Sequence, residues 1–244
     1  MASRATKYLT AVALIAAIAT ICLAAPNLAQ AKTHLFILSG QSNMAGLNPN
    51  LSFTPTVTKA LAPDKVIVVK DAVGGQPIRR WYKKWHAPKG KNTPAGKKPW
   101  GDLYDRMMQK VNKAIGETRP DTVTFVWMQG ERDARESLAE VYSESFRGII
   151  AQLKADLKRD DINAVIGRIS DFDMANKRYP HWTKIRDIHV KLAETDLRTE
   201  WVDTDDLNGT KNGLHYTKPG YVELGKRFAQ KGLKLLAGGG KAGK

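Results

Sequence analysis

The sequence predicts an α/β fold, a three-layer α/β/α sandwich of the flavodoxin-like type around a parallel sheet of about five strands. Two observations indicate this fold. Short apolar runs rich in β-branched residues recur along the chain, and segments whose apolar residues follow helical spacing separate them. Strands that alternate with helices are typical of a parallel sheet covered by helices on both faces. The length of 244 residues fits one such domain.

Five segments are predicted as strands. The first is the apolar run THLFIL, and the second is KVIVVKDA, which is rich in valine. TVTFVWM and NAVIGRIS follow, and EWVDT is a weaker fifth. In residue numbers the strands cover 33–38, 65–72, 122–128, 163–170 and 200–204.

Four helices are predicted between and after these strands, because apolar residues recur there three or four positions apart. They cover 102–116, 137–157, 179–197 and 218–236. Residues 46–63 are rich in proline and predict a surface loop. Residues 82–100 are basic and carry Trp85 and Trp100. These aromatic residues among cations could stack on a sugar or a base, or could be incidental to a mobile loop.

The first 31 residues are predicted to be a secretory signal peptide. Arg4 and Lys7 give it a positive start, an apolar run over 8–25 follows, and the small residues AQA precede a cleavage site after Ala31. An uncleaved membrane anchor is the alternative, because the run approaches the length that spans a bilayer. The prediction is therefore a secreted or periplasmic protein without stable membrane insertion after cleavage.

Removal of the signal would leave one domain of ordinary size, residues 32–237, and a flexible basic tail, residues 238–244. Cys22, the only cysteine, lies in the predicted signal, which excludes a disulfide, a cysteine nucleophile and a cysteine metal site in the mature chain. The mature chain would keep 37 Lys and Arg against 24 Asp and Glu. The resulting net positive charge attracts polyanions, including anionic polysaccharides. The alternative is that the lysines and arginines simply solvate the surface. Nucleic acid is not an expected partner, because charge alone would support it.

Polar residues with chemical potential follow the predicted strands. The first strand ends in GQSNM, which contains Ser42, and the second leads to a glycine pair at 74–75. The third ends in WMQGE, and the block NGLHYTKPGY places His215 just before the last helix. Ligands of open parallel sheets bind beyond the carboxyl ends of the strands. A hydroxyl, an imidazole, an amide with a carboxylate and close backbone are what acyl transfer needs.

Four blocks carry a family resemblance: GQSNMAG (40–46), GGQPIRRW (74–81), WMQGERDA (127–134) and LHYTKPGYVELGKRFA (214–229). In this order they resemble the SGNH hydrolases, in particular the sialate O-acetylesterase-like and acetylxylan esterase group, carbohydrate esterase family six. The resemblance implies a serine esterase that removes acyl groups, above all acetyl, from a carbohydrate, without a cofactor or metal. A catalytically degenerate carbohydrate-binding domain and a small-acyl esterase of non-sugar substrates are the alternatives.

The resemblance also implies roles for individual residues. Ser42 would be the nucleophile and His215 the base that takes its proton. The oxyanion hole would combine the backbone N–H of Ser42, the N–H of Gly75, with Gly74 as its alternative, and the side-chain amide of Gln129. Such donors stabilise the charge that develops on the tetrahedral intermediate.

Trp81 and Asn43, which belong to the same blocks, are predicted to bind substrate. Each block also has a plainer interpretation. Ser42 could cap the following helix, since serine is favoured there, and His215 could be an ordinary surface histidine.

The third member of the triad is an open question in this sequence. Most SGNH enzymes have an aspartate three residues before the histidine, and Asn212 stands there instead. Glu131 is the first candidate, with a predicted hydrogen bond to His215 Nδ1, followed by Asp206 and Asp205. A Ser–His dyad with Asn212 is the weakest option. Without any carboxylate at His215, a weak dyad enzyme or a binding domain would be expected.

Overall fold

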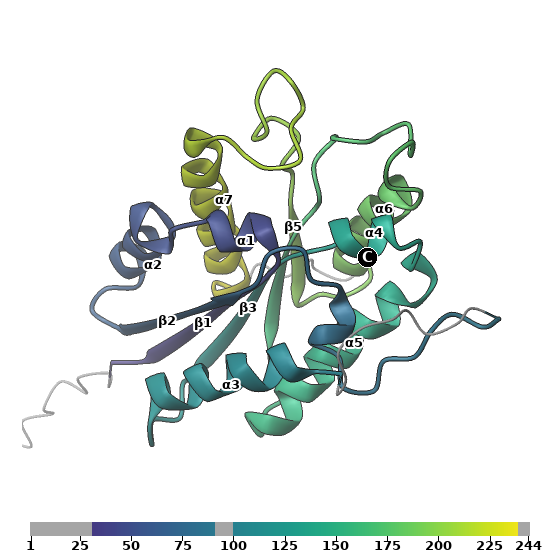
Figure 1. Cartoon of the computed structure of the whole chain (residues 1–244). Coiled ribbons are helices and arrows are strands. Elements are labelled where there is room, and N and C mark those ends of the chain that lie inside the picture. The colour runs from purple at the N-terminus through teal and green to yellow at the C-terminus, as the bar shows by residue number, and fades with distance from the viewer. Residues whose placement is uncertain (1–30, 91–99, 239–244) are drawn as a thin grey trace, which may run out of the picture. The chain divides into compact units, whose positions relative to one another are not determined.

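The structure, a computed structural model, describes residues 31–90 and 100–238. Five parallel strands form one sheet in the order β2-β1-β3-β4-β5 (Figure 1). They are β1 Thr33–Gly40, β2 Lys65–Ala72, β3 Thr122–Met128, β4 Asn163–Gly167 and β5 Thr199–Val202. The predicted fold class is confirmed, and each predicted strand forms.

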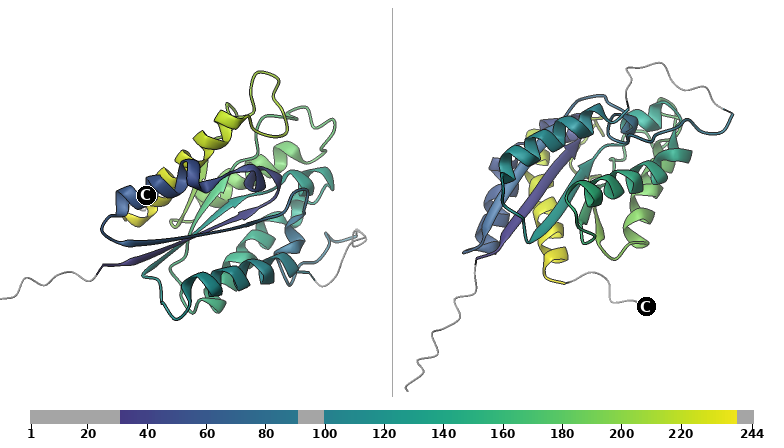
Figure 2. Two further views of the ribbon diagram at one scale, coloured as in Figure 1. Left: turned by 60° about the vertical axis from the view of Figure 1, so that its left-hand side comes forward. Right: turned by 90° about the horizontal axis from the view of Figure 1, so that it is seen from below.

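Helices cover both faces of the sheet, as Figure 2 shows. One layer consists of α2 Phe53–Leu61 and α7 Lys218–Leu236, and Phe53 meets Phe36 of β1 with ring centroids 5.4 Å apart. The other layer consists of α3 Asp102–Ile115, α5 Ala139–Asp156 and α6 Trp182–Glu194. In this layer the ring centroid of Phe146 of α5 lies 6.5 Å from that of Phe125 of β3. A strand buried on both faces is apolar throughout, which explains the unbroken run in β1.

The register of the central strands aligns their carboxyl ends. Gly40, the last residue of β1, pairs with Ala72 of β2 and with Met128 of β3. Three of the polar blocks therefore leave the sheet at the same level.

One sequence prediction about the fold is wrong. The proline-rich segment 46–63 is not a loop, because it contains the 3₁₀ turn η1 Pro49–Leu51 and the helix α2. Pro55 lies in the first turn of α2, where a backbone N–H would have no intrahelical partner, so proline is tolerated there. Phe53 and Val57, one turn apart, are fully buried and fix the helix on the sheet.

The two tryptophans of the basic segment have a structural explanation. Trp85 is only 4% exposed and meets Trp100 edge to face, with ring centroids 5.6 Å apart. The guanidinium of Arg79 lies 5.6 Å and 5.7 Å from the two ring centroids. Packing within this cation–π cluster accounts for both rings. The intervening residues 91–99 lie outside the described part of the chain.

Both predicted terminal segments fall largely outside the described residues, which include only Ala31 of the signal peptide and Gly238 of the tail. Across 31–90 and 100–238, no helix combines the length and the apolar character needed to cross a bilayer.

Candidate active site

A sharp turn after β1 places Ser42 at the edge of the sheet. Gly40 has φ +145°, and a Cβ there would lie 2.0 Å from the Met128 carbonyl oxygen, so only glycine fits. The next residue, Gln41, donates its N–H to the same oxygen at 2.9 Å. The short helix α1 Ser42–Gly46 then begins at Ser42. Its position at the carboxyl end of the central strands is visible in Figure 1.

The structure brings Ser42 and His215 together. Ser42 Oγ lies 3.0 Å from His215 Nε2, although the residues are 173 positions apart in the sequence. His215 precedes α7, whose first turn is capped by the Thr217 hydroxyl, which accepts a hydrogen bond from the Gly220 N–H at 3.0 Å. A hydroxyl within hydrogen-bond reach of an imidazole nitrogen is the arrangement of an activated nucleophile and its base.

A cleft of about 350 Å³ opens at this pair. Four of the predicted site residues line it: Ser42, Gly75, Glu131 and His215. The other lining residues are Gln41, Gly74, Arg132, Arg135, Tyr179 and Leu214. Proximity to the WMQGE block could have suggested the two arginines, whereas nothing in the sequence singles out Tyr179.

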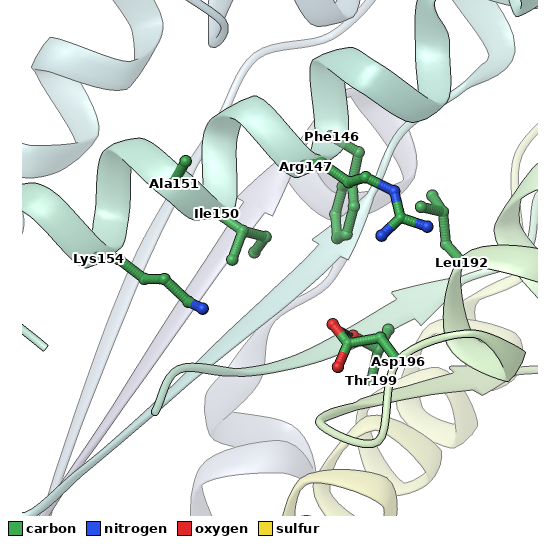
Figure 3. Close-up of a pocket in the computed structure, with 8 residues that line it drawn as sticks. All are labelled: Phe146, Arg147, Ile150, Ala151, Lys154, Leu192, Asp196 and Thr199. Atoms are coloured by element: carbon green, nitrogen blue, oxygen red, sulfur yellow. Dashed lines mark hydrogen bonds between the residues drawn. The ribbon is translucent and has the colours of Figure 1, made fainter. Parts of the chain in front are cut away.

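A separate, smaller pocket of about 210 Å³ lies between α5 and α6 (Figure 3). Figure 3 labels the apolar residues Phe146, Ile150 and Leu192 among those that line it, together with the charged residues Arg147 and Asp196. It shares no residue with the cleft and contains none of the predicted site residues.

Backbone N–H groups are available beside Ser42. As the first residue of α1, Ser42 has an N–H without an intrahelical acceptor. Gly74 faces it closely, since a Cβ on Gly74 would lie 3.7 Å from the Ser42 Cβ. Gly75 adopts φ +68°, which turns the exposed backbone at the cleft. Gly74 therefore lies beside Ser42, and Gly75 lines the same cleft.

The position of Gln129 corrects its predicted role. The side chain is fully buried, and its Nε2 donates to Asp133 Oδ2 at 2.5 Å, to Gln41 Oε1 at 3.2 Å and to the Gln76 carbonyl at 3.2 Å. Its Oε1 accepts from the Tyr142 hydroxyl at 2.9 Å. Because the side chain is fully buried, is absent from the cleft lining and donates to interior acceptors, Gln129 is not placed to contact an oxyanion.

Neither predicted substrate-binding residue reaches the cleft. Trp81 is fully buried, donates its indole N–H to Ser39 Oγ at 3.0 Å and meets Trp127 edge to face at 5.1 Å. Asn43 is 2% exposed and faces the interior. Both predictions need correction, because interior partners occupy the polar groups of these side chains.

The two aspartates proposed for the triad are engaged elsewhere. Asp205 accepts from Arg186 at 2.7 Å and 2.9 Å and from Arg168 at 2.8 Å. Asp206 accepts from Arg227 at 2.7 Å and 2.6 Å. Neither carboxylate hydrogen-bonds to His215, so neither orients the imidazole.

Asn212 is exposed and lies in a tight turn, with φ +44° and its N–H donated to the Gly209 carbonyl at 3.0 Å. No hydrogen bond joins its side chain to His215. Within the described part of the chain, no carboxylate forms a hydrogen bond or an ion pair with His215, whose one side-chain hydrogen bond is to Ser42.

Glu131 lies at the cleft wall without contacting His215. As the first residue of α4 Glu131–Arg135 it is 2% exposed, and its Oε1 accepts from Asn43 Nδ2 at 2.8 Å. Its Oε2 is buried and has no partner among the described residues. Burial raises the pKa of Glu131 to about 7, an effect that the hydrogen bond from Asn43 opposes. The predicted hydrogen bond from His215 to Glu131 is absent.

Ser42, His215 and the backbone turn at 74–75 thus gather at the carboxyl edge of a parallel sheet, where proteins with open α/β sheets bind their ligands. The model of the family described as carbohydrate esterase, sialic acid-specific acetylesterase, matches residues 45–234. The chain belongs to this family, and it is a carboxylic ester hydrolase of the carbohydrate esterase type. The matched region contains His215 and begins three residues after Ser42.

Several known proteins are similar to this chain. A probable carbohydrate esterase of Arabidopsis thaliana is 25% identical over 203 residues, which cover 81% of this chain and 66% of that protein. A solved Arabidopsis thaliana structure superposes with a TM-score of 0.64 at 21% identity, covering 83% of this chain and 98% of that one.

A carbohydrate acetylesterase of Xanthomonas citri gives a TM-score of 0.60 at 16% identity, over 84% of this chain and 57% of that chain. A lipase/acylhydrolase of Enterococcus faecalis gives 0.50 at 15% identity, over 86% and 99%. These structural similarities show a shared fold.

Proposed function

We propose that the protein is a secreted serine esterase that removes O-acyl groups, above all acetyl, from a carbohydrate. The observation that carries the proposal is the 3.0 Å approach of Ser42 Oγ to His215 Nε2 at a cleft, in a chain of a carbohydrate esterase family. Secretion is supported by the signal-like pattern of the first 31 residues.

The mechanism follows from this geometry. Ser42 Oγ attacks the ester carbonyl carbon while His215 Nε2 takes the hydroxyl proton. Backbone N–H groups of Ser42 and of the 74–75 turn stabilise the resulting oxyanion. As the intermediate collapses to an acyl-enzyme, the bond from the carbonyl carbon to the sugar oxygen breaks, and His215 gives its proton to that oxygen, which leaves as a hydroxyl group. A water molecule, deprotonated by His215, then attacks the acyl carbon. The bond from that carbon to Ser42 Oγ breaks, and His215 returns the proton to Oγ as the carboxylic acid is released.

The charge that forms on His215 is stabilised differently from that of a full triad. In a triad, a buried carboxylate holds the imidazole and stabilises the imidazolium. Here His215 is exposed and has no carboxylate partner among the described residues, so solvent stabilises the cation. The site therefore works as a Ser–His dyad, with Glu131 removed from the direct role that the sequence suggested.

Two arginines on the cleft wall favour an acidic carbohydrate. Arg132 donates to Glu136 at 2.6 Å, whereas the exposed Arg135 has no hydrogen bond or ion pair to any described residue. A guanidinium free to bind matches a carboxylate in bidentate geometry. We therefore include an anionic acylated sugar or polysaccharide among the expected substrates.

The test compares Ser42→Ala with wild type on p-nitrophenyl acetate and on a set of acetylated glycans, with acetate release as the readout. Ser143→Ala, a substitution of the same kind on α5, is the control. Loss of both activities in Ser42→Ala alone supports the proposal. Activity retained in Ser42→Ala contradicts the nucleophile assignment. Hydrolysis of the chromogenic ester without acetate release from any glycan would favour the non-sugar esterase.

A further inference from the structure

The side chain of Asn43 connects four parts of the site. Its Nδ2 donates to Glu131 Oε1 at 2.8 Å and to the Leu214 carbonyl at 3.1 Å. Its Oδ1 accepts from the Tyr216 N–H at 3.4 Å and from the Tyr221 hydroxyl at 3.1 Å. Both amide hydrogens and both acceptor positions are therefore in use. A surface residue would not be satisfied so completely by protein groups.

Two of these hydrogen bonds hold the backbone on either side of the proposed base, His215. Leu214 and Tyr216 are the neighbours of His215, and both hydrogen-bond through their backbone to Asn43. Asn43 itself follows Ser42 in the first turn of α1. The amide thus joins the backbone that carries the base to the helix that carries the nucleophile.

This connection matters because few other hydrogen bonds fix the position of His215. The imidazole is exposed and makes one side-chain hydrogen bond, to Ser42. Beyond Asn43, the segment is anchored by the Tyr216 hydroxyl on Thr204 Oγ1 at 2.9 Å and by the Thr217 N–H on the Leu207 carbonyl at 3.1 Å. These two anchors lie on the α7 side of the histidine, and on its other side the Gly213 N–H donates to the Asn208 carbonyl at 3.3 Å.

Glu131 determines which way the amide of Asn43 faces. Above its pKa of about 7 the Glu131 carboxylate is ionised and can only accept hydrogen bonds, so it turns Nδ2 toward itself. Oδ1 is then directed at the Tyr216 N–H and the Tyr221 hydroxyl, which are both donors. The opposite orientation would set oxygen against oxygen at Glu131 and at the Leu214 carbonyl. Glu131 is buried, and the low local dielectric strengthens this preference.

We propose that Asn43 is a positioning residue for the base His215, and that Glu131 acts on the histidine through Asn43. The inference rests on the proposed function. No carboxylate orients the imidazole. Instead, Asn43 fixes the backbone on both sides of the histidine in its position relative to Ser42.

The first test is Asn43→Ala, with kcat and KM measured on p-nitrophenyl acetate. Misplacing a catalytic group by about 1 Å costs on the order of 100-fold in rate, so kcat should fall by about 100-fold while KM changes little. Asn163→Ala is the matched control, because this buried asparagine starts β4 at the opposite end of the sheet and accepts from Arg198 at 3.3 Å. Its kcat should equal that of wild type.

Tyr221→Phe keeps the test usable if Asn43→Ala does not fold. It removes one hydrogen bond from Asn43 Oδ1 at a half-buried ring, and kcat should fall several-fold at unchanged KM. Wild-type kcat in a folded Asn43→Ala, or in Tyr221→Phe when the former is unfolded, overturns the proposal.

The Glu131 pair separates positioning from charge. Glu131→Gln retains an oxygen that can accept from Asn43 Nδ2, so kcat should stay within about tenfold of wild type. Glu131→Leu removes the acceptor and should lower kcat about as much as Asn43→Ala, on the order of 100-fold. A fall of 100-fold in both variants would show that the charge acts directly and would overturn the indirect role.

Covalent labelling distinguishes failure of this inference from failure of the proposed function. Diethyl p-nitrophenyl phosphate should phosphorylate Ser42 in wild type, and the rate should fall in parallel with kcat in Asn43→Ala. Activity and labelling that persist in Ser42→Ala would refute the proposed function itself. Loss of both in Ser42→Ala, with Asn43→Ala unaffected, would refute the positioning role alone.

Discussion

Replacing Asp133 by asparagine should make the protein progressively more stable, relative to wild type, as the pH rises from acid to neutral. Asp133 lies fully buried below the cleft, and its Oδ2 accepts from the Ile78 N–H at 2.8 Å and from Gln129 Nε2 at 2.5 Å. Burial raises the pKa of Asp133 to about 7, although these hydrogen bonds oppose the shift. The asparagine Oδ1 can accept the same two bonds without a charge.

The magnitude follows from linkage. The carboxyl titrates near 3.8 in the unfolded chain and near 7 in the folded protein. Its raised pKa contributes stability that is fully present below about pH 4 and is lost as the pH rises toward 7. At about 1.4 kcal/mol per pKa unit, the loss amounts to about 4 kcal/mol. The asparagine variant does not ionise and so escapes this loss.

The assay is urea unfolding at a series of pH values from 3 to 8, with the difference in unfolding free energy between Asp133→Asn and wild type as the readout. Taking the difference cancels carboxylates such as Asp102, whose pKa is lowered by the hydrogen bond from Arg80 and which lose stability in acid. The difference should move by about 4 kcal/mol in favour of asparagine between pH 3 and pH 8.

Asp160→Asn is the control, since it removes the same charge from an exposed position. Asp133→Asn can also lower the free energy of unfolding by the same amount at every pH, and this is compatible with the reasoning. Asp133 Oδ1 is buried without a partner among the described residues, so the amide group of asparagine would be unsatisfied there. A difference that does not change with pH would refute it, since the carboxyl would then titrate alike in the folded and unfolded chain.

Three further outcomes are expected. Arg135→Gln should raise KM severalfold for an acetylated acidic sugar without changing hydrolysis of p-nitrophenyl acetate. The control Arg147→Gln, at the separate pocket, should leave the hydrolysis of both esters unchanged. Equal effects of Arg135→Gln on both esters would contradict a carboxylate-binding role. Gly40→Ala should abolish activity and lower the thermal midpoint, because its Cβ would collide with the Met128 carbonyl; a midpoint within about one degree of wild type would disprove the steric argument. EDTA should leave activity unchanged, because no three potential metal-binding side chains gather within the described residues; loss of activity restored by added metal would contradict this expectation.

The sequence predicts the sheet and its covering helices well because apolar residues recur along the chain with the period of a strand or of a helix. The apolar run in β1 and the helical spacing in α7 are local patterns that the fold retains. The helix α2 was missed because prolines outweighed the Phe53 and Val57 pair, although Pro55 occupies a position where proline costs little.

The site was predictable as a set of segments but not as a set of contacts. Ser42 and His215 stand in motifs that indicate their proximity, and the structure places them 3.0 Å apart. The direction of a buried polar side chain depends on partners that lie far away in sequence. Gln129 turns toward Gln41, 88 residues away, and Asp205 toward Arg186. No local pattern carries that information.

The hydrogen bonds of the site also determine when it can exist during folding. Those that join α1 to α7 and to the segment before it link positions 171 to 178 residues apart. Contacts between such distant parts of a chain require closing a long loop and are slow to form. The sheet can pair β1 with β2 and β3 before α7 docks, but Ser42 then has no histidine beside it. Recovery of esterase activity during refolding would therefore report the docking of the last helix, whereas circular dichroism would report the earlier strands and helices.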